Sequence, residues 1–359
     1  MALTPADAVL SVGQRIGRYF ALISMIPALF LVLWIYILIV SGAISGAPSF
    51  HNIQDALTQW PAGKIIELTV ATLATAVVLH PLQFATTQLL EGYWGTTPLA
   101  IAAMQVRVAH HRKHRRNLLQ QAATHRNALK QAKESFTREI VDKDPRLKED
   151  EAKKDLDRKV RIRMAGPRGD SLAAHHMGIQ EATDHASKYP GKTDRILPTQ
   201  LGNALRCFED SAGSQYGLSA LLIAPHLHLI VPDLHRQYLI DARQSMDSAI
   251  RICTVGLVAT IVTVGFMLTH GLWLLCAIVP YSVSYLAYKG AVSAAYAYGR
   301  VVESVIDLDR FLLYKKLHAG QPEDSQEEKK NNIELMKMLS GQDANISYRQ
   351  GKGSSRPRA

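Results

Sequence analysis

The sequence predicts an all-α, polytopic membrane protein in which four transmembrane helices form two antiparallel hairpins with helical cytoplasmic extensions. The apolar residues gather in two blocks, at about residues 19–94 and 252–298, although the whole chain is 47% hydrophobic and 20% charged. The net charge of +10 is concentrated between these blocks, above all in residues 107–168. Long uncharged runs suit a bilayer and the charged remainder suits water.

The first predicted span is the run from Tyr19 to Ile44. No Asp, Glu, Lys or Arg occurs between Arg18 and His51. A bilayer core about 30 Å thick needs about 20 helical residues, so this run is long enough to cross. A signal peptide has a shorter apolar region of about 7–15 residues, and here a second apolar run follows, so a membrane anchor is favoured.

The second predicted span, Leu68 to Leu90, is more polar than the first. It carries His80 and Pro81 near its middle and is flanked by Glu67 and Glu91. A helix that packs on other helices, or that lines a hydrated cavity, accepts such residues more readily than a lipid-facing helix does. The same argument applies to its threonines, which are Thr69, Thr72, Thr75, Thr86 and Thr87.

The third and fourth predicted spans share one uncharged stretch. No Asp, Glu, Lys or Arg occurs from Ile252 to Tyr288, which is too long for one helix of ordinary tilt. The stretch divides at Thr269-His270-Gly271 into two halves of about 17 residues, close to the lower limit for spanning. Helical residues outside the stretch are expected to complete each span.

The orientation follows from the positions of lysine and arginine. The loop from Ser45 to Gly63 and the hairpin tip at His270 contain neither residue. The N-terminal segment, the middle of the chain and the segment after the fourth span all contain them. Because positively charged loops stay in the cytoplasm, both termini and the middle segment are predicted to be cytoplasmic.

Five regions are expected along the chain. The middle region should form a long helix or a helical hairpin, loosely paired as in a coiled coil, because residues 99–163 contain no Gly and only Pro145 interrupts them. Residues 164–195 are expected to be loop. The regions are an N-terminal transmembrane hairpin (1–95), a basic cytoplasmic stalk (96–165), a cytoplasmic linker and helical subdomain (166–250), a C-terminal transmembrane hairpin with a cytoplasmic helix (251–318), and a mostly disordered tail with one short helix at Ile333–Leu339 (319–359).

Several longer motifs resemble a known family. They are LLEGYWG at 89–95, LGNALR at 201–206, YGL at 216–218, LIDARQSMD at 239–247, HGLWLL at 270–275 and AYGRVVESVIDLDRFLLY at 297–314. The chain resembles, over most of its length after Leu89 except the basic stalk, an uncharacterised family of multi-pass membrane proteins of the actinobacterial type. The resemblance implies a bacterial inner (plasma) membrane and implies no activity or catalytic residue.

Three residues of the second span are candidates for a pore or a sensor. His80 is titratable near physiological pH and Pro81 frees a backbone carbonyl, so the pair suits a pore-lining or proton-sensing role. The alternative is a neutral histidine hydrogen-bonded to a neighbouring helix. Glu91 is either an ordinary boundary charge or a partner for a basic residue such as Arg251 or Lys289.

A basic cluster in the stalk is the second candidate. Contact with anionic lipid headgroups suits its position about a dozen residues past a membrane exit, at about 1 kcal/mol for each basic residue. A metal ion shared at i, i+4 spacing is disfavoured by the surrounding cations, and nucleic-acid binding by the lack of a known motif or interleaved aromatic residues. The cluster comprises His110, His111, Arg112, Lys113, His114, Arg115 and Arg116.

Aspartates on the helices beside the third and fourth spans are the last candidates. They favour ion pairs with Arg243, Arg251, Arg300 and Arg310 on the same two helices, and a catalytic carboxylate pair acting on lipid is the weaker alternative. The sequence contains no GxSxG, HExxH, GxGxxG or Walker A motif, which disfavours an enzyme. The aspartates are Asp241, Asp247, Asp307 and Asp309.

The leading functional prediction is therefore an oligomeric channel-like or sensory unit, gated by its cytoplasmic domain. The alternative is a membrane-anchored scaffold that binds cytoplasmic partners or anionic lipid without transport activity. The expected partners are the bilayer and its anionic headgroups, with a homo-oligomer and a cytoplasmic protein both left open. No cofactor and no metal are predicted, and the three cysteines form no CxxC pair.

Overall fold

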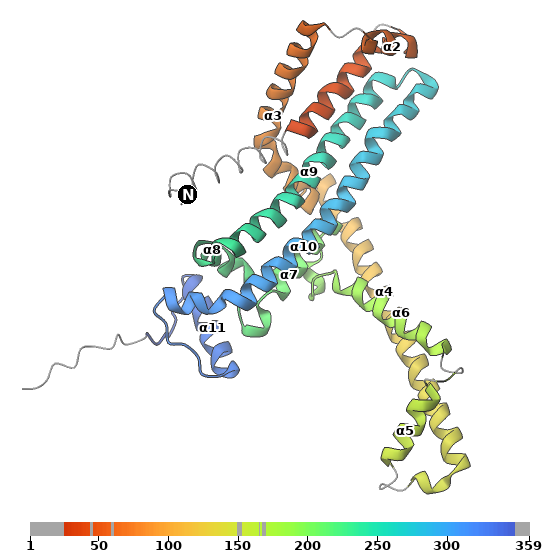
Figure 1. Cartoon of the computed structure of the whole chain (residues 1–359), viewed down its shortest axis with the longest axis vertical. Helices are drawn as coiled ribbons and strands as arrows, with labels where there is room; N and C mark the ends of the chain where they lie inside the picture. Colours follow the sequence, from red (N-terminus) through yellow and green to blue (C-terminus); the bar gives the residue numbers. More distant parts are fainter. Residues whose placement is uncertain are drawn as a thin grey trace, which may run out of the picture. The chain divides into compact units, whose positions relative to one another are not determined.

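The computed structural model describes residues 25–43, 46–58, 61–148, 153–164, 166 and 170–348. They belong to two compact units, with residues up to Trp94 and from Ser211 onward in unit 1 and Gly95–Asp210 in unit 2. Apart from an isolated bridge between Ala319 and Tyr348, the regular structure of these residues is helical (Figure 1). The predicted all-α class is confirmed.

Unit 1 contains the apolar helices. Among the described residues, α3, α9 and the segment formed by η5 and α10 are long and apolar enough to cross a membrane. In the first predicted span, Met25–Val40 is a shorter apolar helix followed by a turn at residues 41–43, and the remaining residues of that run lie outside the described residues. Besides Met25–Val40, the helices described in this unit are α2 (Phe50–Thr58), α3 (Ala62–Glu91), η4 (Ser214–Tyr216), α8 (Ala220–Ile230), α9 (Asp233–Met267), η5 (Gly271–Ala277), α10 (Ile278–Lys316) and α11 (Ser325–Leu339).

Helices α9 and α10 pack side by side along most of their length (Figure 1). They run antiparallel, because Gly256 lies against Ser284 while His235, earlier in α9, contacts Asp309, later in α10. Small side chains lie in this contact, since the hydroxyl of Ser284, which lies against Gly256, donates a hydrogen bond to the Cys253 carbonyl at 2.8 Å. Small residues allow two helix backbones to approach closely, as in helix pairs within membranes. The chain turns between them at η5, next to the division that the sequence predicts.

The last described segment differs from the expected disordered tail. Helix α11 begins at Ser325, eight positions before the predicted short helix, because Asp324 caps it by accepting hydrogen bonds from the backbone N–H groups of Gln326 and Glu327. Its Leu335 is 2% exposed. Helix α8 packs against the second half of α10 in the same unit, so α8 and α11 both belong to its folded core.

Unit 2 is built on one long helix. Helix α4 ends at Lys143, and the chain turns at Asp144 and Pro145 as the sequence predicts. Part of the predicted loop over 164–195 is instead helical, because α6 packs along α4 and buries the apolar residues Leu172, Ala182 and Ala186 (Figure 1). The helices are α4 (Pro98–Lys143), η1 (Pro145–Lys148), α5 (Lys153–Met164), α6 (Asp170–Ser187), η3 (Thr193–Arg195) and α7 (Gln200–Ser211), whose last residue falls in unit 1.

Candidate functional site

A small pocket lies between the helix Met25–Val40, α3 and α9 in unit 1. Its volume is about 130 Å³. One part of the lining is apolar and the other is polar. The apolar residues are Pro27, Ala76, Leu79, Leu82, Val255 and Val258, and the polar ones are His80, Gln83, Thr86, Arg251 and Thr254.

Helical spacing brings these residues to one place. On α3 they recur at intervals of three or four residues from Ala76 to Thr86, and on α9 from Arg251 to Val258, so each set occupies one face of its helix. The helix Met25–Val40 is held beside α9 by Leu31, which packs on Val255. The pocket is therefore a product of three helices, far apart in sequence, that share a contact region.

Arg251 is the most strongly polar group of the pocket. Its Nε donates a hydrogen bond to the Gln83 side-chain oxygen at 2.9 Å, and a terminal guanidinium nitrogen donates to the same oxygen. A guanidinium that is partly removed from water requires acceptors, and Gln83 supplies one from α3 without adding a charge. This hydrogen bond joins two of the candidate membrane-spanning helices.

His80 lines the same pocket as Arg251, the residue that directly precedes the uncharged stretch Ile252–Tyr288. The candidate sensor of α3 and a permanent cation of α9 therefore share one pocket. Pro81 lies inside α3, which continues past it, and Glu91 is the last residue of α3, about two turns beyond Gln83.

Three of the five threonines that the sequence analysis singled out form hydrogen bonds within α3. The Thr69 hydroxyl donates to the Ile65 carbonyl, the Thr72 hydroxyl to the Leu68 carbonyl and the Thr86 hydroxyl to the Gln83 carbonyl, all within their own helix. A hydroxyl satisfied in this way needs no water, so these side chains are compatible with lipid or with a packed interface. Threonine content alone is no evidence for a hydrated path.

The basic cluster of unit 2 divides into inward-facing and outward-facing residues. His111 is 3% exposed, and its Nδ1 lies 3.1 Å from the Tyr189 hydroxyl. Arg112 and Arg115 donate to the carbonyls of Thr193 and Gly191, at 3.1 and 3.0 Å. These three residues hold the chain before α7 onto α4, and burial removes His111 from the predicted headgroup contact. The outward-facing members are His110, Lys113, His114 and Arg116.

The environment of His111 favours the neutral imidazole. Burial, followed by the nearby positive charges of Arg107 and His110, lowers the pKa of His111 from 6.5 to about 4. Burial also raises the pKa of the Tyr189 hydroxyl above its ordinary value of 10.0. Both side chains therefore stay uncharged near neutral pH and form a neutral hydrogen-bonded pair, which suits a structural contact.

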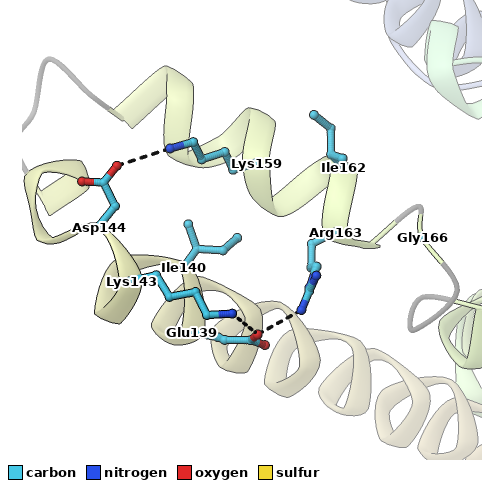
Figure 2. Close-up of a pocket in the computed structure, with 8 residues that line it drawn as sticks. All are labelled: Glu139, Ile140, Lys143, Asp144, Lys159, Ile162, Arg163 and Gly166. Atoms are coloured by element: carbon cyan, nitrogen blue, oxygen red, sulfur yellow. Dashed lines mark hydrogen bonds and ion pairs between the residues drawn. The ribbon is translucent and has the colours of Figure 1, made fainter.

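A wider groove lies between α4 and α5, and Figure 2 shows its ion pairs. The Glu139 carboxylate accepts from Lys143 and from Arg163, both at 3.0 Å, and Asp144 pairs with Lys159 at 3.4 Å. The groove has a volume of about 780 Å³. Because these partly exposed charges already have partners, they serve to align the two helices, and each pair contributes about 0–1 kcal/mol.

Two histidines of unit 2 also meet. The Nδ1 atoms of His125 on α4 and His175 on α6 are 2.9 Å apart, so one ring donates a hydrogen bond to the other. In the described part of the chain no three His, Cys, Asp or Glu residues are grouped as metal ligands would be. The pair therefore joins α4 to α6 as a hydrogen-bonded contact.

The aspartates near the third and fourth predicted spans are paired only partly as the sequence predicts. Asp247 pairs with Arg243, a predicted partner, but within α9, at 3.4 Å. Asp309 instead lies 2.5 Å from His235 across the α9–α10 interface. The Glu328 carboxylate of α11 accepts a hydrogen bond from Arg310 Nε at 2.6 Å. The roles of His235, Glu328 and Gln83 depend on tertiary contacts, and no local pattern in the sequence indicates them.

The pocket beside Arg251 thus brings an ionisable group, a permanent cation and apolar side chains together around an open volume. Comparisons of the chain with protein-family models, with curated proteins and with solved structures found no match.

Proposed function

We propose that this chain is a four-span protein of a bacterial inner membrane that acts as a sensory unit. The first span would be the run Tyr19–Ile44, whose described part includes the helix Met25–Val40, and the others would be α3, α9 and α10 with η5. They would form two antiparallel hairpins, with both termini and unit 2 in the cytoplasm. The distribution of lysine and arginine supports this orientation.

The observation that carries the sensory role is the continuity of α9. This helix contributes Arg251 and Val258 to the pocket and runs without interruption back to Asp233. At 1.5 Å per residue, Arg251 and Asp233 are about 27 Å apart along the helix axis. A shift of α9 against α3 at the pocket therefore displaces the far end of α9 as well.

At the ends of α9 and α10 that are remote from the pocket, α8 and α11 form a folded core with α10. Ile223 and Leu227 of α8 pack with Val305 and Leu313 of α10 in one core cluster, against which Met336 of α11 also packs. Packed cores move as rigid elements, so a displacement of the two long helices changes the surface formed by α8 and α11. In this proposal the signal acts at the pocket, and the response is a change in the surface formed by α8 and α11.

Hydrogen–deuterium exchange on the protein in lipid nanodiscs tests the coupling. Gln83→Ala removes the acceptor that holds Arg251 to α3, so amide exchange in α8 and α11 should change by about threefold or more, equivalent to about 0.7 kcal/mol. Lys64→Ala, at the other end of α3, is the control and should leave exchange in α8 and α11 unchanged. Equal exchange in both variants and the parent protein would remove the basis for the sensory role.

Two further outcomes separate the alternatives. Purified protein that conducts ions in liposomes, with a flux that His80→Ala changes, would favour a channel over a sensor. A scaffold would rely on the outward-facing residues of the basic cluster, including Lys113 and Arg116. A scaffold would still bind its partners or anionic lipid after α3 is replaced by an unrelated apolar helix, whereas a sensory unit would lose its response.

A further inference from the structure

We infer that the pocket beside Arg251 binds an anionic lipid, with the lipid phosphate against Arg251 and His80 and the start of an acyl chain against the apolar residues. This inference names the ligand of the proposed sensory site and rests on that proposal for the membrane placement. It concerns a different site from the basic cluster in unit 2. Three properties of the pocket lead to it.

The first property is the two-part lining. Apolar side chains from all three helices, among them Pro27, Leu79 and Val258, line the pocket together with Arg251 and His80. Pockets for whole small molecules have volumes of about 300–1,000 Å³. A pocket of about 130 Å³ accommodates only part of such a ligand. A ligand with a charged end and an apolar continuation that leaves the pocket matches this lining.

The second property is the sign of the charge. The residues that line the pocket include the permanent cation Arg251 and the titratable His80, and none of them is Asp or Glu. Gln83 contacts Arg251 with a neutral oxygen. The nearest acidic residue on α9, Asp247, lies one turn earlier, where it forms an ion pair with Arg243 and also attracts Arg251 electrostatically. A planar guanidinium matches the geometry of phosphate oxygens and forms charge-assisted hydrogen bonds with them.

The third property is the depth of the pocket. Arg251 is the residue immediately before the uncharged stretch Ile252–Tyr288, so in the proposed topology it lies where hydrocarbon gives way to headgroups on the cytoplasmic side. Anionic lipids are concentrated in that leaflet. An ordinary boundary arginine extends toward water, whereas Arg251 is held across the helix interface by Gln83. The guanidinium is therefore already positioned for a phosphate.

Native mass spectrometry of the detergent-solubilised full-length chain tests the inference with three probes. They are phosphatidylglycerol, diacylglycerol of the same chain length, which has no phosphate, and inorganic phosphate. Phosphatidylglycerol should bind about tenfold more tightly than diacylglycerol, the ratio expected when one charge-assisted hydrogen bond is gained. Arg251→Gln should abolish this preference.

Two more variants make the result decisive. Gln83→Glu adds a carboxylate beside Arg251 and keeps an acceptor for it, so it should lower phosphatidylglycerol binding even if Arg251→Gln fails to fold. Lys289→Gln removes an exposed cation at the end of the same uncharged stretch and should change binding by less than about twofold.

Each contrary result has a distinct meaning. Equal losses in all three variants would show nonspecific attraction to the membrane surface and overturn the inference. Equal binding of the two lipids would also overturn it, and displacement of phosphatidylglycerol by millimolar inorganic phosphate would assign the pocket to a soluble anion. If Gln83→Ala alters amide exchange in α8 and α11 while the two lipids bind equally, the sensory proposal stands and only the lipid assignment fails.

Discussion

Unit 1 and unit 2 distribute their side chains in opposite ways. In unit 1 the contact between α9 and α10 includes small residues such as Gly256 and Ser284, while large apolar residues such as Val77 and Phe84 on α3 are 72% exposed. In unit 2, α4 presents mainly charged and polar residues to its surroundings from Arg107 onward. Unit 1 therefore suits an apolar solvent, and this part of unit 2 suits water. The pattern of buried and exposed residues indicates the surrounding solvent more directly than the average composition of the chain does.

The two units also differ in what joins their helices. In unit 1 the backbones of α9 and α10 approach so closely that a Cβ atom on Gly256 would lie 2.9 Å from the Ser284 nitrogen. In unit 2 the contacts to α4 include the His111–Tyr189 pair and arginine side chains that donate to loop carbonyls. Changes of shape should therefore damage unit 1 most, and changes of protonation should damage unit 2.

The largest effect is expected for Gly256→Leu. A Cβ at this position meets the Ser284 backbone and the Pro280 carbonyl oxygen, at 2.9 and 3.0 Å, and backbone atoms cannot move aside as a flexible side chain can. The free energy of unfolding of unit 1 should fall by about 3 kcal/mol. Thermal unfolding in detergent, followed by circular dichroism, measures the change. Gly265→Leu is the matched control, because among the described residues only the adjoining backbone of α9 itself lies close to a Cβ built there.

A smaller effect is expected for Glu328→Gln. The Arg310–Glu328 pair is largely buried, at 15% and 8% side-chain exposure, and Arg310 also stacks on the Tyr216 ring at 3.9 Å. Loss of the carboxylate charge should weaken the docking of α11 by about 2 kcal/mol and accelerate amide exchange in α11. Lys337→Gln, which breaks a more exposed pair with Glu334, should change exchange much less. Similar effects of the two variants would mean that α11 is held by its apolar side alone.

The smallest effect at neutral pH, and the most selective one, is expected in unit 2. The folded state lowers the pKa of His111 from 6.5 to about 4, so the unfolded state binds more protons between these values. The contribution of His111 to stability is therefore complete above pH 6.5 and is lost as the pH falls toward 4. At pH 5 the loss should be on the order of 1–2 kcal/mol.

Amide exchange in η3 and α7, corrected for its intrinsic pH dependence, measures this loss. His111→Phe removes the titrating group and should flatten the pH dependence between 6.5 and 4. His176→Phe replaces an exposed histidine of α6 and should leave the dependence as in the parent protein. A pH dependence that survives in His111→Phe would assign the titration to another group.

The sequence predicted those features that depend on runs of one kind of residue. The uncharged stretch Ile252–Tyr288 predicted α9, α10 and the break between them, and the Asp144-Pro145 pair predicted the end of α4. Helix α6 was missed because Gly166-Pro167, Gly169 and Pro190-Gly191, near the two ends of residues 164–195, indicate a loop. Within α6, the His125 ring of α4 occupies the space beside Gly178, 2.7 Å from where a Cβ would lie. A glycine that makes room for a ring on another helix cannot be recognised from neighbours in sequence.

The candidate site was predicted only in part. His80 was singled out from its own run of residues, and it does line a pocket. The contact between Gln83 and Arg251, which line the same pocket, was not predicted, because these two residues are 168 positions apart and no periodicity connects α3 with α9. The basic cluster was read as one surface for a similar reason, since only the packing of Tyr189 on α4 separates His111 from its exposed neighbours.

The unbroken course of α9 also determines how the molecule can be taken apart. Its helical hydrogen bonds continue from the charged residues near Asp233 into the uncharged residues after Arg251, with no proline between them. A cut inside this helix would create new ends, with up to four unpaired N–H and four unpaired C=O groups. Proteases should therefore act first at connecting loops, such as the one around Gly191, and a fragment lacking its apolar helices would have to begin and end at such loops.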